Sequence, residues 1–202
     1  GLYVRGGGPD QNLIILDDAP VYNANHLFGF FSTFNGDALK SVELIKGGFP
    51  ARYGGRLSSV LNLTMKEGNK EGVHGEFGVG LISSRLTLEG PIKKKKGKSS
   101  FLISGRRTYI DVLTAPIIAA ANEGGTTGGY YFYDLNMKVN TTLNPKNRFF
   151  FSSYFGRDRF YFRFKESDFQ YNQGLQWGNL TATGRWNHQF APNLFSNTSV
   201  IA

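Results

Sequence analysis

The stretch that decides the fold is DALKSVELIKGGFPARYGGRLSSVLNL, residues 37–63. Side chains of two kinds alternate over residues 42–46, as in a short β-strand, and Gly47, Gly48 and Pro50 end the pattern. A second alternating segment covers residues 57–64. The stretch therefore predicts two strands joined by a glycine-rich turn.

Working outward from this stretch, four short motifs follow one another in a fixed order. They are Val4-Arg5-Gly6, the apolar segment Leu13 to Asp17, Val42 to Gly47, and Tyr53-Gly54. This order resembles the plug domain of TonB-dependent outer-membrane receptors. The fuller segments HLFGFFSTFN (26–35) and KGGFPARYGGRLSSVLN (46–62) are similar to the Bacteroidota-type branch of that family. Asp18 stands where the family usually has glycine, so the turn type after residue 17 is left open.

The composition allows a membrane protein only of one kind. No apolar run approaches the roughly 18 residues of a transmembrane helix, whereas a membrane-spanning strand needs only about 9 to 11 residues of alternating character. The net charge of +8 would ordinarily suggest a nucleic-acid partner, but residues 93–98 supply five of the positive charges in what we interpret as a solvated turn. The chain has no cysteine, which leaves its redox compartment open. It opens inside a motif, so we expect it to be an internal part of a longer protein.

Residues 131–143 show the clearest strand pattern. Tyr131, Tyr133, Leu135 and the odd positions after them are mostly apolar, while the even positions from Asp134 to Thr142 are polar. A soluble sheet gives this pattern, and so does a transmembrane barrel with its apolar side chains toward lipid. Turns at 144–147 and 191–193, and a change of alternation near Ser83 and Ser84, divide the region from residue 73 onward into seven predicted strands.

The connections between these strands differ in length. Residues 93–98, 144–147 and 191–193 are short, and they alternate with long links at 111–129 and 164–174. Outer-membrane barrels have short periplasmic turns and longer external loops, so the long links are expected on the outside. Residues 111–122 are predicted to form a helix within the first of them.

The resemblance implies a mainly β fold in two parts. Residues 1–70 would be the C-terminal half of a plug domain with a small mixed α/β sheet. Residues 71–202 would be the first antiparallel, up-and-down strands of a transmembrane β-barrel of about 22 strands. It also implies energy-coupled uptake of a scarce ligand across the cell outer membrane, driven by a TonB-type complex that acts on a segment upstream of residue 1. The lipid bilayer, a nutrient ligand and an accessory surface lipoprotein are the other partners that this family suggests.

If the family layout holds, the ligand faces two plug apices, residues 22–34 and 49–53. Aromatic and amide side chains there suit sugars or flat chelates, and an arginine suits an anion. The predicted ligand-binding residues are Tyr22, Asn23, Asn25, His26, Phe28, Phe30, Phe31, Arg52 and Tyr53. The phenylalanines equally suit packing of the plug against the wall. Arg5, Glu43 and Arg56 are predicted polar ties between plug and barrel, with a solvated position in a wet lumen as the alternative.

No other motif points to chemistry. The three histidines are far apart in sequence, so we expect no metal site and no cofactor, and no Ser, His and Asp grouping suggests an enzyme. A rival interpretation is a basic, aromatic-rich β module that binds single-stranded nucleic acid, suggested by residues 148–164 (RFFFSSYFGRDRFYFRF). A third is an outer-membrane protein that anchors a lipoprotein without transport. Siderophore, cobalamin, oligosaccharide and peptide all remain open as the ligand.

Overall fold

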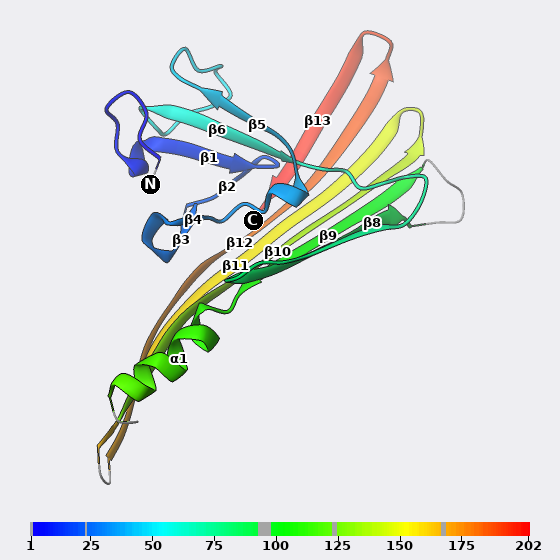
Figure 1. The fold of residues 1–202 in the computed structure, drawn as a ribbon. Helices are drawn as coiled ribbons and strands as arrows, with labels where there is room; N and C mark the ends of the chain where they lie inside the picture. The colour runs from blue at the N-terminus through cyan, green and yellow to red at the C-terminus, as the bar shows by residue number, and fades with distance from the viewer. Residues whose placement is uncertain (1, 23, 93–97, 123–124, 167–168) are drawn as a thin grey trace.

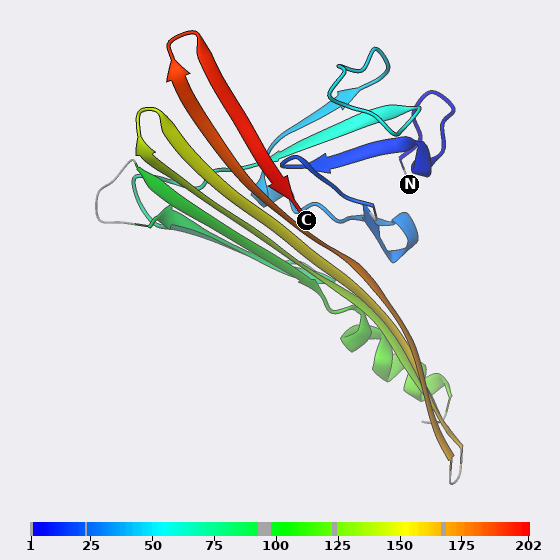
Figure 2. The ribbon, with the colours of Figure 1, turned by 180° about the vertical axis from the view of Figure 1, so that it is seen from behind.

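The computed structural model describes residues 2–22, 24–92, 98–122, 125–166 and 169–202. Two sheets account for most of this chain, and Figures 1 and 2 show the smaller, N-terminal sheet standing against one face of the larger, curved one. We call the first region, up to β6, the plug and the sheet from β7 onward the wall. The two faces of the wall are therefore different surfaces: an inner face toward the plug and an outer face away from it.

The plug is a four-stranded sheet with the order β2-β1-β6-β5. Its strands are β1 (Asn12–Leu16), β2 (Ala19–Pro20), β5 (Leu39–Ile45) and β6 (Ser59–Met65), and a separate pair is formed by β3 (Asn25–His26) and β4 (Phe31–Ser32). Short 3-10 turns lie at η1 (Pro9–Gln11), η2 (Leu27–Gly29) and η3 (Gly36–Ala38). β1 and β6 are parallel, while β5 and β6 are antiparallel and are joined by the predicted glycine-rich connection.

A two-residue turn, Asp17 and Asp18, joins β1 to β2. Its geometry gives the turn type that the sequence leaves open at Asp18. Leu16 pairs with Ala19, and both intervening residues have left-handed backbone, with φ of 45° at Asp17 and 75° at Asp18. Positive φ at both central residues is the requirement of a type I′ hairpin turn. Aspartate tolerates this conformation better than most non-glycine residues, so the turn that the family builds with glycine forms here too.

We predict that Asp18→Gly leaves the urea midpoint of plug unfolding almost unchanged. Glycine removes the backbone strain but also the ion pair with Arg185, 3.1 Å away, and each effect is worth about 1 kcal/mol or less at this half-exposed site. Asp18→Val, whose branched side chain disfavours positive φ, is expected to cost about 1–3 kcal/mol. Asp18→Asn is the control that keeps the turn and removes the charge. If glycine were as damaging as valine, the ion pair and not the backbone would control this turn.

The wall is a single antiparallel sheet in which each strand pairs with the next along the chain. Its seven strands, the number predicted from the sequence, run in the order β13 to β7. They are β7 (His74–Val79), β8 (Ser83–Pro91), β9 (Ser99–Thr108), β10 (Thr126–Asn144), β11 (Asn147–Glu166), β12 (Phe169–Ala191) and β13 (Leu194–Ile201). Helix α1 (Ile110–Ala121) lies between β9 and β10, at the position predicted for it, and packs on β10.

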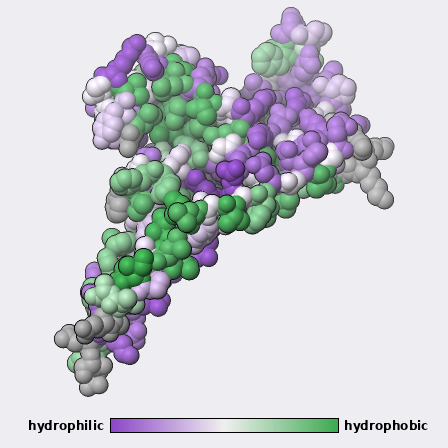
Figure 3. All heavy atoms as spheres, viewed as in Figure 1, coloured by the Kyte–Doolittle hydropathy of each residue, from purple (hydrophilic) through white to green (hydrophobic). Residues whose placement is uncertain are grey.

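The two faces of the wall have the reverse polarity of a soluble sheet. On β10 the inward side chains Asp134, Asn136, Lys138 and Asn140 are all at most 4% exposed, whereas the outward Leu135 is 37% exposed. Figure 3 shows the same division, with hydrophilic residues gathered between the sheets and hydrophobic residues along the outer side of the wall. A polar face against the plug and an apolar face outward is the arrangement of a barrel wall in lipid.

One predicted loop is wrong. Residues 164–174 were expected to form a long link, but β11 continues to Glu166 and β12 begins at Phe169, with pairs such as Phe164 to Tyr171 between them. The rings of Phe162 and Phe164 lie 6.2 Å apart, and those of Phe164 and Tyr171 6.4 Å apart. These aromatic contacts hold the hairpin together beyond the length that a bilayer requires. The lysine turn at 93–97 lies outside the described residues.

The core lies where the plug meets the wall. Ile14, Leu16, Leu63 and Met65 of the plug are buried with Leu102 of β9 and Tyr154 of β11, and with the plug residues Val21 and Ala38. Hydrophobic contact alone therefore fixes the approximate position of the plug on the wall. The polar contacts around this core fix its register, and they form the site described next.

Candidate functional site

A histidine of the plug is inserted into the inner face of the wall. His26 ends β3, and Leu27 follows it with a left-handed φ of 47°, which turns the chain directly into η2. The imidazole stacks on the Phe132 ring with 3.9 Å between centroids and 7° between planes. His26 is 1% exposed, so it is a buried contact between the two parts of the molecule.

Both nitrogens of this imidazole contact a carboxylate of the wall. Nδ1 lies 2.7 Å from Oδ2 of Asp158 on β11, and Nε2 lies 2.7 Å from Oδ1 of Asp134 on β10. The register places Phe132 opposite Asp158 and Asp134 opposite Gly156, so the two carboxylates flank the stacked ring. A neutral imidazole has one N–H and donates to one carboxylate, whereas an imidazolium donates to both. The geometry therefore favours the protonated form.

Neighbouring groups complete the hydrogen bonding of the two carboxylates. Arg106 donates from Nε to Asp134 over 2.9 Å, and the Tyr154 hydroxyl donates to the same carboxylate over 2.9 Å. The Tyr130 hydroxyl donates to Asp158 and accepts from the backbone N–H of Leu27 at 2.8 Å. We refer to the six residues that make this network as the His26 cluster: His26, Arg106, Tyr130, Asp134, Tyr154 and Asp158.

Charge balance favours a protonated His26 between the two carboxylates. Two carboxylates face one guanidinium inside the cluster, so a protonated His26 brings the total to zero. Burial by itself lowers the pKa of His26, but the hydrogen bonds to Asp134 and Asp158 and their negative charges outweigh it and raise that pKa above 6.5. The imidazolium is thus a counter-ion that the plug delivers to the wall.

The backbone of β11 is adapted to this cluster at Gly156. A Cβ at that position would overlap the Tyr154 hydroxyl and would lie 3.0 Å from Oδ1 of Asp134. Even alanine would displace the tyrosine from its hydrogen bond. Glycine at this position therefore serves close packing inside the cluster.

A second buried ion pair joins the plug to the wall on β10, at the inward position four residues after Asp134. Lys138 of β10 places Nζ 2.8 Å from Oδ2 of Asp17, with both side chains at most 4% exposed. The ammonium also donates to the Met65 carbonyl over 3.0 Å, while Asp17 Oδ1 accepts from the Met65 N–H over 3.2 Å. Asp17, Lys138 and Met65 thus form a closed set of hydrogen bonds that couples the β1–β2 turn to β6 and β10.

Further polar contacts surround these two buried sets. Asn35 donates to Ser104 over 2.7 Å, and the Glu67 carbonyl accepts from both Ser100 and Asn140 over 2.7 Å. More exposed ion pairs connect Asp18 with Arg185 and Asp37 with Arg85. The junction between plug and wall is therefore mostly polar outside the core.

The structure separates the predicted ligand residues into three groups. Tyr22 and Asn25 line a hollow of about 280 Å³ in the plug, together with Arg56. Arg52 and Tyr53 line another, of about 390 Å³, with Asp17, Asp18 and Arg185. There the Arg52 guanidinium donates to the Tyr53 hydroxyl over 2.7 Å.

The third group lies at the wall. His26 has no free nitrogen, as described above, and Phe31 contacts the Phe132 ring at 5.6 Å between centroids. Phe30, the neighbouring residue in the chain, is 83% exposed. Asn23 and the side chain of Phe28 lie outside the described residues. Of the aromatic residues predicted at this apex, Tyr22 and Phe30 are the ones that the structure shows presented on the surface.

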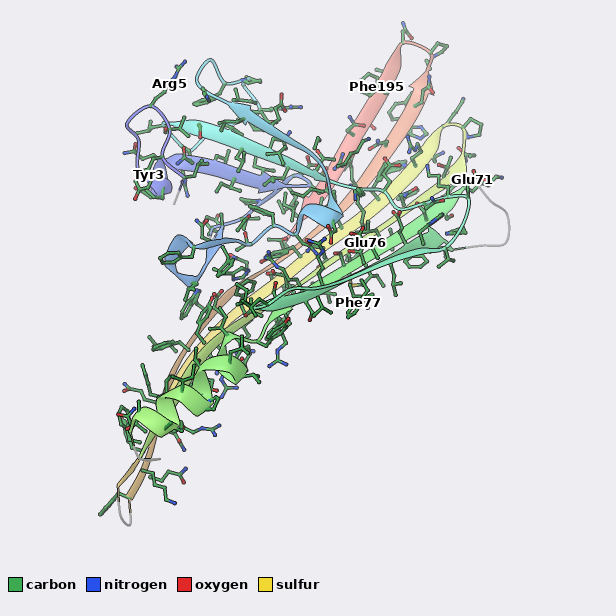
Figure 4. All side chains as sticks on the ribbon, in the orientation of Figure 1. Tyr3, Arg5, Glu71, Glu76, Phe77 and Phe195 are labelled. Atoms are coloured by element: carbon green, nitrogen blue, oxygen red, sulfur yellow. The ribbon has the colours of Figure 1, made fainter. Side chains whose placement is uncertain are left out.

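The predicted ties at Arg5, Glu43 and Arg56 have no wall partner within the described ranges. All three are exposed, and Arg5 lies at the end of the plug remote from the wall (Figure 4). Glu43 accepts from Asn62 over 3.3 Å, and Arg56 donates to the Gly55 carbonyl over 2.8 Å, both within the plug. The side-chain ties that the structure does contain use other plug residues, among them Asp17, Asp18, His26, Asn35 and Asp37.

Alternation along the strands points to part of this junction. Asp134 and Lys138 occupy polar, even-numbered positions of a strand whose other face is apolar, which marks them as inward. No spacing in the sequence indicates that His26 or Asp17 meets them, because 108 residues separate His26 from Asp134. The same limit applies to Asp158, which lies in a segment read mainly for its aromatic residues.

None of the helices that the structure describes is both long and apolar enough to cross a bilayer. Within the same residues, no group of three or more histidine, cysteine and acidic side chains has the geometry to hold a metal ion.

Comparisons with known proteins agree with this architecture. Residues 1–59 match the family model described as TonB-dependent Receptor Plug Domain. The whole chain is similar to the siderophore receptor PirA from Pseudomonas aeruginosa, at 17% identity and a TM-score of 0.53, over 98% of this chain and 40% of that one. At such identity the likeness shows the fold. The comparison with curated protein sequences gives no match.

Two other solved structures match with lower TM-scores. They are the siderophore receptor PirA from Acinetobacter baumannii (15% identity, TM-score 0.49, 98% of this chain and 40% of that one) and a mutant of the ferric enterobactin receptor PfeA from Pseudomonas aeruginosa (18% identity, TM-score 0.47, 96% and 37%). The chain spans about two fifths of the length of these three proteins.

Proposed function

We propose that the chain serves energy-coupled uptake of a scarce ligand, on the premise that its residues 1–59 match the plug-domain model of the TonB-dependent receptors. The observation that carries the proposal is the docking of this plug, through the His26 cluster, on the polar face of a wall whose other face is apolar. A plug held inside a membrane barrel closes it, so transport requires that the plug move. The energy would come from a TonB-type complex acting on a segment upstream of this chain.

The chemistry of the junction suits reversible movement. Buried ion pairs gain little over their hydrated, separated partners, because the loss of solvation offsets much of their attraction. When the plug shifts, water can replace each protein partner of His26, Asp17 and Asn35. A junction made only of apolar contacts would lose its full burial energy on opening. Polar contacts therefore fix the position of the plug on the wall in the closed state, while the free-energy cost of opening the junction stays moderate.

The ligand is proposed to meet the plug around Tyr22, Asn25 and Phe30. Exposed aromatic rings and an amide beside Arg56 suit a flat chelate or a sugar, with preference for an anion. A ferric siderophore is the first class to test, since siderophore receptors are among the proteins of similar fold. Cobalamin, oligosaccharides and peptides complete the panel. An accessory surface lipoprotein stays open as a partner.

The nucleic-acid alternative is less well supported by the arrangement of its aromatic residues. Phe149, Phe151 and Phe155 lie on the outer face of β11, while Phe150 and Tyr154 lie on the inner face. Tyr154 is completely buried against the plug. Rings on opposite faces do not form the continuous stacking surface that single-stranded nucleic acid requires.

A reversible covalent lock tests whether the plug moves. The chain has no cysteine, so an Asn35→Cys and Ser104→Cys pair, at positions whose side chains now touch, would be unique in it. We expect oxidation of this pair, verified by a gel mobility shift, to abolish uptake of a radiolabelled ferric siderophore by whole cells. Reduction should restore it, and binding of the ligand at the cell surface should persist in both states.

The two single-cysteine variants control for the substitutions themselves. If the oxidised pair still transported every ligand in the panel, plug movement at this junction would be refuted. If neither state transported any of them while a surface lipoprotein still co-purified with the chain, an anchoring role would replace the transport proposal.

A further inference from the structure

The outer face of the wall changes abruptly from apolar to cationic at one level. Below that level the outward side chains on five neighbouring strands are apolar: Leu86, Ile103, Leu135, Phe155 and Leu180. At the next outward position Tyr133 pairs with Arg107 on one side and Arg157 on the other. One position further, Tyr131 pairs with Arg159, which pairs with Gln176, and Arg163 lies opposite Asn172.

From this arrangement we propose that Arg107, Arg157, Arg159 and Arg163 bind the phosphate groups of a phosphorylated glycolipid headgroup in the outer leaflet of the membrane. We call these four residues the outer arginine cluster. The proposal concerns the outer face of the wall, and it stands whether or not the plug moves or any ligand is transported.

The level of the cluster matches the edge of the bilayer. Residues 147–157 of β11 run from the short turn at one end of the wall to Arg157. A tilted strand crosses the hydrocarbon layer with about 9 to 11 residues. Arg157 and its neighbours therefore lie where the strand leaves hydrocarbon and enters the headgroup region. The connection that carries α1 and the extended β11–β12 hairpin lie at this end, and longer connections mark the outer side in barrels of this kind.

The four guanidinium groups carry no acidic partner within the part of the chain that the structure describes, and tyrosine side chains orient three of them. Arg107 and Arg163 lie over the rings of Tyr131 and Tyr161, with Cζ at 5.2 Å and 5.5 Å from the centroids, and Arg159 donates to the Tyr131 hydroxyl over 3.4 Å. All four arginines are exposed. These tyrosine contacts restrain the guanidinium groups of Arg107, Arg159 and Arg163 while leaving N–H groups free, which is the preparation that bidentate binding of phosphate requires.

The groups beside the arginines indicate a sugar as well as a phosphate. A hollow of about 560 Å³ is lined by Arg159 and Arg163 together with Asp111, Asn172 and Gln176. Asp111 is 7% exposed, and its Oδ1 accepts no hydrogen bond from any described residue. A carboxylate would repel a phosphate but accepts readily from a hydroxyl, and the amides can both donate and accept. A phosphate bound by the arginines, with sugar hydroxyls bound by Asp111 and the amides, would give each of these groups a hydrogen-bond partner.

The cluster lies in the interior of the sheet, away from its two edge strands. β10 and β11, which carry most of these residues, have paired strands on both sides, so the strand register sets their outward neighbours. Further wall strands would attach at β7 or β13 and would leave this outer surface open to lipid.

Native mass spectrometry of the receptor, purified from outer membranes in detergent, tests the proposal. The probe is phosphorylated lipid A, compared with its dephosphorylated form and with phosphatidylglycerol. We expect Arg157→Gln/Arg159→Gln/Arg163→Gln to weaken binding of the phosphorylated form about a hundredfold, from roughly fivefold for each cation at a membrane surface. Lys146→Gln, which removes an exposed cation at the opposite end of the wall, should change nothing.

Each comparison has a decisive outcome. Equal binding of the dephosphorylated form, or unchanged binding by the triple variant, overturns the phosphate site. Equal binding of phosphatidylglycerol overturns the glycolipid assignment, and displacement by a single-stranded oligonucleotide would make the cluster a nucleic-acid surface instead. Retention of heat-modifiable migration in gels verifies that the triple variant is folded, and Asp111→Asn should weaken binding without removing the preference for phosphate.

Discussion

His26→Leu is expected to destabilise the docked plug by about 3–5 kcal/mol, the cost of leaving buried charge without its partner. The substitution keeps an apolar side chain against Phe132 but leaves Asp134 and Asp158 with Arg106 as their sole ionic partner among the described residues. The Tyr130 and Tyr154 hydroxyls can still donate, yet they bring no charge. The wall then presents a net negative charge to the plug, and water must enter the junction.

The readout is the rate at which a buried cysteine becomes accessible. Thr33→Cys places a unique thiol at a position with 0% exposure next to the junction, and labelling by a membrane-impermeant maleimide reports opening. Phe30→Cys, at an exposed position of the same segment, corrects for the reactivity of the thiol itself. Labelling of Thr33→Cys should rise by about two to four orders of magnitude in the His26→Leu background, following the free-energy difference.

The pH dependence of the same measurement identifies the charged form. Because the pKa of His26 is raised in the docked state, its contribution is fully present below about pH 6.5, the ordinary value for a free histidine, and is lost as the pH rises through the higher, docked value. Opening of the wild-type plug should therefore increase with pH above 6.5, while His26→Leu should be nearly insensitive over that range. A wild-type plug that opened equally at pH 6 and pH 9 would show that His26 is held as a neutral side chain.

The sequence predicts those features of this molecule that depend on residues close together in the chain, and it fails for features that depend on residues far apart in the chain. Alternation over residues 131–143 correctly indicates a strand with a polar inner face, since alternation depends only on neighbours along the chain. The helix after β9 follows from local pattern in the same way. Residues 164–174 were misread as a loop because Gln170, Asn172 and Gly174 are typical of loops. Beyond the bilayer both faces of a strand can meet water, so the apolar signal disappears while the backbone pairing continues.

The site depends on contacts that no local pattern encodes. The sequence suggests His26 as a ligand residue because it lies in an aromatic segment. In the structure both nitrogens of its ring contact carboxylates, 108 and 132 residues away in the chain. Arg5, Glu43 and Arg56 were selected as ties because they are charged, and the plug turns them toward solvent or toward itself. Asp17, in contrast, was placed only as the end of a strand. Its left-handed turn is what aims its carboxylate at Lys138.

Lys138→Met is the second substitution with a large expected effect, again about 3–5 kcal/mol. Methionine fills most of the space of the lysine stem but leaves the Asp17 carboxylate buried without a cation, and it leaves the Met65 carbonyl without the ammonium donor. The urea concentration at which an Ala38→Cys thiol, buried at 0% exposure beside the junction, becomes half labelled should fall accordingly.

The double variant Asp17→Asn/Lys138→Met distinguishes two quantities. One is the net stabilisation that the ion pair provides, and the other is the destabilisation caused by leaving one buried charge unpaired. Asparagine adopts the left-handed backbone of residue 17 and accepts the Met65 N–H as aspartate does, so the β1–β2 turn should persist. We expect the double variant to recover most of the lost stability, because the buried charge disappears with its partner. Arg185→Met, which breaks the half-exposed pair with Asp18, is the matched control and should cost less than about 1 kcal/mol. A double variant as unstable as Lys138→Met would mean that the ion pair itself, beyond mere charge neutrality, holds the plug in the wall.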